Sequence, residues 1–281
     1  MSEFVTSDGV KLHYELRGQG RPLLVCQGGP NATYRHLPEH LLEIESDFRL
    51  VYSDYRGSGA SASAPVETYT VERLADDLDE LCTHLGLDQV DVLAHSMGGF
   101  VALNLALRHP SRCRSLALLA ATPVGRIWKL APVTALALGP LRIAKLLVRT
   151  LIYFGWWWWL RDSPERTKAR YAMIMSMQEP RRRAQGLYRE EAQGFVLNDN
   201  APVLERATYH TDLTSSLREI RCPALVLYGT RDAVFVAGAL FLAWGLPNAR
   251  VAPLRGLSHL PYLEDRPQTI GAIRAFLSEA C

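Results

Sequence analysis

A serine lies in the sequence AHSMGG, where residues 94–99 join an apolar strand to a helix. The apolar run at residues 90–94 predicts the strand, and the helix is expected over residues 97–107. A serine on such a sharp turn has its hydroxyl exposed at the C-terminal edge of a sheet, and small residues two positions away let strand and helix approach. The standard pattern is G-x-S-x-G, and Ala94 replaces its first glycine. Ser96 is therefore a candidate nucleophile.

A serine hydroxyl needs an imidazole to take its proton and a carboxylate to orient that imidazole. Asp232 follows the strand expected at residues 224–228, and His259 follows the strand expected at residues 250–254. Because parallel strands end at one sheet edge, we expect both side chains near Ser96. Each also fits a structural role, Asp232 as a turn or cap residue and His259 as a loop residue. Their order along the chain predicts a triad of Ser96, Asp232 and His259.

Strand and helix patterns alternate toward both ends of the chain, and this alternation would position the three side chains. It predicts a doubly wound, mostly parallel α/β sheet with helices on both faces. The 281 residues fit one domain with an insertion. Strands are expected at residues 10–16, 23–27, 48–53, 90–94, 116–121, 224–228 and 250–254, and helices at 71–85, 97–107, 236–244 and from about 267 onward.

The alternation stops between residues 122 and 210, where prolines interrupt a series of helical patterns. We expect a helical insertion there and a core domain formed by residues 1–121 and 211–281. The insertion has 14 Lys and Arg against 7 Asp and Glu, whereas the remainder has 17 against 22. Its apolar stretches are shorter than the ~20 residues of a membrane span, so no transmembrane segment is expected. The tryptophans at 156–159 are expected to line a pocket or to dock the insertion on the core.

Together these features resemble the α/β-hydrolase fold family, from about residue 10 to residue 277. Two further segments carry the resemblance, QGGP at residues 27–30 and DYRGSGAS at residues 54–61. The resemblance implies that residues 122–210 are a cap domain. It also implies an oxyanion hole formed by the backbone N–H groups of Gly29 and Met97. Gln27 stands where the family usually has a histidine, and His95 is expected to point away from Ser96.

A serine at this turn argues against dehalogenases and epoxide hydrolases of the family, which use an aspartate. The resemblance implies an esterase or lactonase that acts on a small, partly hydrophobic substrate through an acyl-serine intermediate. The GGP and DxRGSGxS segments are similar to the proline iminopeptidase branch, so an aminopeptidase is the second interpretation. Two alternatives remain open: a carbon–carbon bond hydrolase or lyase with the same triad, and a ligand-binding protein without turnover.

No metal or organic cofactor is expected. Residues 36–40 match the H-x-x-E-H spelling of a zinc peptidase, but Pro38 disfavours the helix that this motif needs. Five scattered cysteines predict neither a disulfide framework nor a zinc cluster and fit a cytoplasmic protein. The net charge of +2 is too small to favour a nucleic acid partner. A small-molecule substrate is therefore the expected partner.

Overall fold

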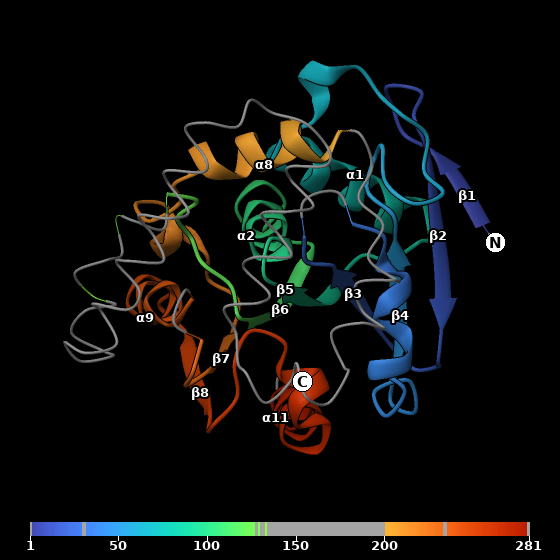
Figure 1. Ribbon diagram of the computed structural model, residues 1–281. Helices are drawn as coiled ribbons and strands as arrows, with labels where there is room; N and C mark the ends of the chain where they lie inside the picture. Colours follow the sequence, from blue (N-terminus) through green and yellow to red (C-terminus); the bar gives the residue numbers. More distant parts are fainter. Residues whose placement is uncertain are drawn as a thin grey trace, which may run out of the picture.

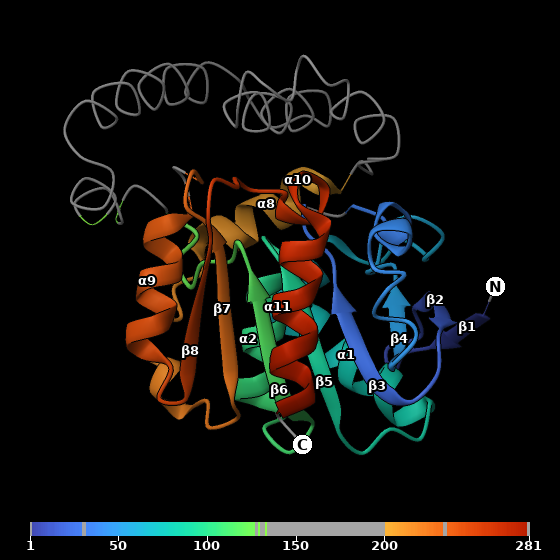
Figure 2. The same cartoon turned by 90° about the horizontal axis from the view of Figure 1, so that it is seen from below.

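The computed structural model describes residues 2–29, 32–126, 129, 133, 200–232 and 235–279. In this part of the chain eight strands form one sheet, which Figures 1 and 2 show from two directions. Their order across the sheet is β1, β2, β4, β3, β5, β6, β7, β8. The bounds are β1 (Ser2–Val5), β2 (Lys11–Arg17), β3 (Arg21–Cys26), β4 (Phe48–Ser53), β5 (Val90–His95), β6 (Cys113–Leu119), β7 (Ala224–Gly229) and β8 (Ala249–Leu254).

The strands from β3 to β8 are parallel to their neighbours, whereas β2 pairs antiparallel with both β1 and β4. β3 lies between β4 and β5, so the chain winds in opposite directions on its two sides. In open α/β sheets such a reversal leaves a crevice beyond the C-terminal ends of the strands, where ligands bind. The predicted α/β fold with a mostly parallel sheet is confirmed.

Helices cover both faces of the sheet (Figure 2). One face carries α1 (Val71–His84), α2 (Gly98–Arg108) and α9 (Val236–Gly245), and the other carries α11 (Arg266–Glu279). In α1, Leu74, Leu78 and Leu81 lie at helical spacing and are buried against the sheet. Thr70 caps this helix, because its hydroxyl oxygen accepts a hydrogen bond from the N–H of Arg73 at 3.1 Å. The helices thus bury an apolar layer on each side of the strands.

The described structure adds two short elements that the sequence pattern does not predict, β1 and α10 (Pro261–Glu264). The bounds of β6 also differ from the prediction: the strand is expected at residues 116–121 and observed at Cys113–Leu119. The reason is local: Ala120 has a φ of 48°, which ends the extended conformation although the sequence there stays apolar. The sequence pattern before the strand at residues 224–228 also predicts a helix that ends near Glu219, and the structure has a single 3₁₀ turn there, Leu217–Glu219.

The two ends of the predicted insertion, within residues 122–210, belong to the described residues. Val124 forms an isolated antiparallel bridge with Asp212, and the ammonium of Lys129 donates to the Asp212 carboxylate at 2.8 Å. The helix α8 (Ala201–His210) packs on the core through Leu204, which is fully buried. The predicted helices between these ends and the tryptophans at 156–159 lie outside the described residues.

Among the described residues, no helix has both the length and the apolar composition needed to cross a membrane. The cysteines in this part of the chain form no disulfide bond; three are buried and Cys222 is partly exposed. Burial raises the pKa of the Cys82 thiol to about 12 and that of the Cys222 thiol to about 11. These thiols therefore stay protonated at neutral pH.

Candidate active site

Ser96 lies on the tight turn between β5 and α2. Its φ is 52°, in the left-handed region that residues other than glycine rarely adopt. Two glycines make the turn possible. A Cβ on Gly98 would collide with the carbonyl oxygen of Cys26, and a Cβ on Gly99 would lie 2.6 Å from the Cβ of Ala121. The turn thus needs glycine at both positions, and the Ser96 side chain stays partly exposed.

Asp232 follows β7 and His259 follows β8, and the two side chains meet Ser96 at the end of β5. Nδ1 of His259 donates to Oδ2 of Asp232 at 2.8 Å, and the Ser96 hydroxyl donates to Nε2 of His259 at 2.9 Å. Because a carboxylate only accepts, Nδ1 carries the hydrogen and Nε2 is the acceptor. Asp232 is fully buried and His259 nearly so. The three predicted residues therefore form one hydrogen-bonded chain.

Phe235 contacts both Asp232 and His259. Its backbone N–H donates to Oδ1 of Asp232 at 3.1 Å, and its ring stacks on the imidazole of His259 with centroids 4.2 Å apart. A positive charge formed on that imidazole would lie against an aromatic face, which is a favourable arrangement. Sequence reasoning missed Phe235, because an aromatic residue three positions after an aspartate has no recognised pattern.

Glu264 holds the loop that carries His259. The N–H of Ser258 donates to the two carboxylate oxygens of Glu264 at 2.9 and 2.8 Å, and the Ser258 hydroxyl donates to Oε1 at 2.6 Å. Glu264 is the last residue of α10, the short turn that follows His259. The carboxylate thus fixes the residue immediately before the imidazole. Sequence reasoning missed Glu264 as well, because its role depends on α10, which no pattern predicts.

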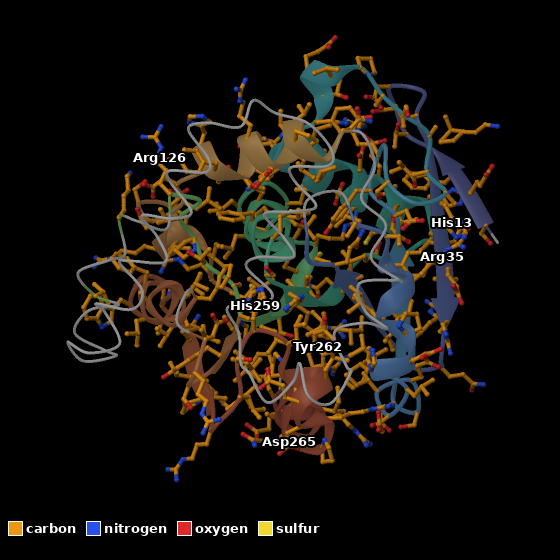
Figure 3. The ribbon with its side chains drawn as sticks, in the orientation of Figure 1. His13, Arg35, Arg126, His259, Tyr262 and Asp265 are labelled. Carbon is orange, nitrogen blue, oxygen red and sulfur yellow. The ribbon has the colours of Figure 1, made fainter. Side chains whose placement is uncertain are left out.

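His95 directs its ring toward the main chain of His259. Its Nε2–H donates to the His259 carbonyl oxygen at 3.0 Å, and its ring meets that of Tyr262 edge-on, with centroids 5.3 Å apart. Figure 3 labels His259 and Tyr262 on this part of the molecule. The ring is thus held by the chain after β8 rather than by Ser96. It also ties β5 to the loop after β8.

The loop after β3 lies directly against the Ser96 turn. A Cβ on Gly28 would be 2.6 Å from Nδ1 of His95 and 3.1 Å from the Cβ of Ser96. Gly29 has a φ of 81°, which suits glycine. Met97 stands at the N-terminal boundary of α2, where backbone N–H groups lack partners within the helix. The segments that carry both candidate oxyanion donors therefore border Ser96.

The zinc-peptidase spelling at residues 36–40 falls on two short 3₁₀ helices, η1 (Tyr34–His36) and η2 (Pro38–His40). Pro38 begins the second of them, so residues 36 and 40 belong to different helices and not to the single helix that the motif needs. Within the described ranges, no three His, Cys, Asp or Glu side chains gather as a metal site would require. Burial and the neighbouring Arg266 lower the pKa of His40.

The chain is similar to known proteins along most of its length. A sequence profile described as alpha/beta hydrolase fold matches residues 21–151. The proposed carbamate hydrolase RutD of Rhizobium rhizogenes is 29% identical over 249 residues, which cover 86% of this chain and 88% of that protein. A proline iminopeptidase-related protein from Thermus thermophilus superposes over 100% of both chains, with a TM-score of 0.74 and 27% identity. The chain belongs to the α/β-hydrolase superfamily.

The sheet of this α/β-hydrolase also superposes on an esterase from Exiguobacterium antarcticum. The TM-score is 0.75 over 99% of both chains, at 20% identity, and this likeness concerns the fold alone. The predicted membership in the α/β-hydrolase family is confirmed. The comparisons support a hydrolase of this fold.

Proposed function

We propose that this α/β-hydrolase is a serine hydrolase that cleaves an ester, lactone or amide of a small, partly hydrophobic substrate. The observation that carries the proposal is the hydrogen-bonded chain from Asp232 through His259 to Ser96. The serine at its end has a backbone conformation that costs about 1–2 kcal/mol in an L-residue. Such strain persists where the surrounding structure enforces it, and it clusters at active sites.

In the first half-reaction, Oγ of Ser96 attacks the substrate carbonyl carbon while Nε2 of His259 takes the serine proton. The carbonyl electron pair moves onto oxygen and gives a tetrahedral oxyanion. The carboxylate of Asp232 orients the imidazole and stabilises the imidazolium that forms. His259 then gives the proton to the leaving alkoxide or amine as the bond to it breaks. The product of this step is an acyl group esterified to Ser96.

Water completes the reaction. Nε2 of His259 takes a proton from a water molecule, and the remaining hydroxide attacks the acyl carbon. When the second oxyanion collapses, the bond to Ser96 breaks and Oγ regains its proton from His259. The carboxylic acid leaves and the free enzyme returns. These steps use only side chains, backbone and water, so the proposed mechanism needs no metal or organic cofactor.

The backbone N–H groups of Gly29 and Met97 are the proposed oxyanion donors. Their segments border Ser96, which is where the negative charge would develop. Donors of this kind act on charge that exists only in the transition state, and losing one typically costs about 3 kcal/mol. We propose residues 122–210 as the cap that selects the substrate beyond these donors.

The relatives favour a carbonyl carbon bonded to oxygen or nitrogen as the reacting centre. RutD is named for carbamates, in which the carbonyl carbon is bonded to both oxygen and nitrogen. The iminopeptidase-related neighbour favours a second candidate, an aminopeptidase. That activity needs carboxylates to bind the substrate ammonium, and Glu205 on α8 is one described carboxylate in the proposed cap.

Covalent labelling and turnover test the proposal. A fluorophosphonate probe should label wild-type protein at Ser96 alone, and Ser96→Ala should remove labelling while keeping a cooperative melting transition. A panel of p-nitrophenyl esters, lactones, carbamates and prolyl amides should contain at least one substrate. Turnover of prolyl amides alone would favour the aminopeptidase, and cleavage of a vinylogous ketone alone would favour a carbon–carbon hydrolase. Wild-type protein that resists labelling would refute the serine mechanism, and tight ligand binding without turnover would then indicate a binding protein.

A further inference from the structure

A buried polar cluster lies behind the loop after β3, on the β1–β2 side of the sheet. His13 on β2 and Tyr34 on η1 are 2% and 1% exposed. Nδ1 of His13 contacts the carbonyl oxygen of Ser2 at 3.1 Å, and Nε2 contacts the Tyr34 hydroxyl at 3.1 Å. The same hydroxyl contacts Oε2 of Glu15 at 2.8 Å. Figure 3 labels His13 at this edge, away from His259.

These contacts hold the Tyr34 hydroxyl on two sides. A backbone carbonyl only accepts, so Nδ1 of His13 donates to Ser2 and the ring is fixed at that nitrogen. The Tyr34 hydroxyl donates to Oε2 of Glu15, and its oxygen lies within hydrogen-bond distance of Nε2 of His13.

The ring of Tyr34 is held as firmly as its hydroxyl. It stacks on Tyr52 with centroids 5.3 Å apart and on His13 with centroids 5.9 Å apart. Burial, and next the hydrogen bond to Glu15, raise the pKa of the Tyr34 hydroxyl, which therefore stays protonated. Tyr52 is fully buried too, but its hydroxyl has no hydrogen-bond partner among the described residues. The two tyrosines thus differ in whether their hydroxyls are hydrogen-bonded.

Charged groups reach the cluster from each element packed against it. Glu3 on β1 is the cross-strand neighbour of His13. The others are Glu15 and Arg17 on β2, Arg35 on η1, Glu45 after η2 and Asp54 after β4.

Tyr34 also closes the loop that carries a candidate oxyanion donor. Gly29 precedes it by five residues. At the start of the loop, Nε2 of Gln27 donates to the carbonyl oxygen of Ala32 at 3.4 Å, and at its end the N–H of Tyr34 donates to Oδ1 of Asp54 at 3.2 Å. Both ends are therefore fixed, and Tyr34, which fixes the C-terminal end, is itself held by His13 and Glu15.

We propose that Tyr34 is a positioning residue for the loop that carries Gly29, and that the contacts of its hydroxyl with His13 and Glu15 hold Tyr34 in place. The inference rests on the proposed serine hydrolase function, because the loop position matters if Gly29 stabilises an oxyanion. That interaction forms in the transition state and not with bound substrate, so misplacing the loop lowers kcat and leaves KM nearly unchanged.

The first experiment compares Tyr34→Phe with Tyr52→Phe, using steady-state kinetics on the best ester of the panel. Both variants keep an aromatic ring in the stack, and Tyr34→Phe removes a hydrogen-bonded hydroxyl. Its kcat should fall about tenfold, since a small misplacement from a distant residue can cost up to about 100-fold. Its KM should stay within about twofold, and Tyr52→Phe should match wild type. Equal kcat values in the two variants would overturn the proposal, and so would a loss confined to KM.

The second experiment measures kcat and KM in His13→Gln and His13→Leu on the same ester. The side-chain amide of Gln can form a hydrogen bond with the Tyr34 hydroxyl, whereas Leu cannot. His13→Gln should keep kcat closer to the wild-type value than His13→Leu does, with KM within about twofold of wild type in both. Equal kcat values in all three proteins would overturn the proposal. This comparison also decides the question if Tyr34→Phe does not fold.

Failure of the inference differs from failure of the proposed function. If wild-type protein is neither labelled at Ser96 nor active on the panel, the proposed function fails and the inference fails with it. If wild type is labelled and active while Tyr34→Phe behaves like Tyr52→Phe, the inference alone fails.

Discussion

Backbone strain in the described part of the chain is concentrated at Ser96 and Ala120, which follow the adjacent strands β5 and β6. Both have positive φ, 52° and 48°, although neither is glycine. Each is tied to the next strand, because the N–H of Ser96 donates to Leu119 at 3.0 Å and the N–H of Ala120 donates to Leu227 at 2.8 Å. The strain therefore lies at the sheet edge where Ser96, Asp232 and His259 meet.

The strain at Ser96 predicts an order of stabilities. Ser96→Gly and Ser96→Ala both remove the hydroxyl, but only glycine adopts positive φ without a steric cost. We expect the free energy of unfolding of Ser96→Gly to be about 1 kcal/mol higher than that of Ser96→Ala. Neither variant should turn over substrate. Urea denaturation measures the difference. The opposite order would show that the turn is not strained in solution.

Replacing Asp232 by asparagine should lower kcat although the side chain keeps its shape. In Asp232→Asn an amide can face Nδ1 of His259 through its NH₂ group, which favours the imidazole tautomer with the hydrogen on Nε2. That tautomer cannot accept the Ser96 proton, so kcat should fall by about 10⁴. Asp265→Asn, at an aspartate that binds Gln268 instead, serves as control and should keep wild-type kcat. A loss below about tenfold in Asp232→Asn would contradict the assigned role.

At the scale of residues, sequence reasoning reaches Ser96, Asp232 and His259 because each follows a strand with a strong apolar pattern. The ends of parallel strands meet at one edge, so the positions of these residues follow from topology alone. Phe235 and Glu264 could not be predicted in this way. Their roles depend on side-chain directions within short loops, and spacing does not fix those directions.

Among the elements, α10 shows how a short turn can position a distant group. Its last residue, Glu264, accepts three hydrogen bonds from Ser258, directly before His259. Glu264→Gln keeps the shape but removes the charge and one acceptor. We expect the free energy of unfolding to fall by about 1.5–3 kcal/mol, the range for hydrogen bonds to charged groups, and kcat to fall severalfold.

The matched control for Glu264→Gln is Glu279→Gln, at an exposed carboxylate on α11 that pairs with Arg250. This surface pair should contribute less than about 1 kcal/mol, and its loss should leave kcat unchanged. Chemical denaturation and steady-state kinetics on both variants make the comparison. Equal effects of the two substitutions would mean that the clamp on Ser258 contributes nothing specific.

Sequence patterns predict the long elements well and the short ones poorly. The strand β4 was expected at residues 48–53 and is observed there, and α1 and β7 differ from expectation by one residue at one end. The four-residue β1 and α10 are too short for a period to be recognised. The end of β6 was misplaced because Ala120 turns the chain within an apolar run, which composition does not reveal.

At the scale of the whole molecule, a buried ion cluster joins the N-terminal hairpin, the loop after β4 and α1. The guanidinium of Arg56 is fully buried and donates to Asp77 at 2.7 and 2.6 Å and to Asp8 at 2.9 and 3.1 Å. Arg73 joins the same carboxylates from α1. These contacts fix three segments that are far apart in sequence.

Neighbouring aspartates on α1 test the value of this burial. Asp77→Ala leaves the Arg56 guanidinium buried with one carboxylate fewer, so it should lower the free energy of unfolding by about 3–5 kcal/mol. Asp76→Ala removes a carboxylate that pairs with the exposed Arg108, and it should cost about 1 kcal/mol. Urea denaturation of both variants gives the two values. Similar losses would mean that water reaches Arg56.

The buried thiols give the folded chain a reporter of its own opening. Three cysteines are buried and protonated in the native state: Cys26, Cys82 and Cys113. An alkylating reagent reacts with thiolates, so it modifies these cysteines slowly in the folded protein. Exposure of the core restores ordinary thiol reactivity. A short pulse of iodoacetamide followed by mass measurement will therefore count the molecules that have opened, with no dye or engineered label, and all three cysteines report on the apolar layer between the sheet and the helices α1 and α2.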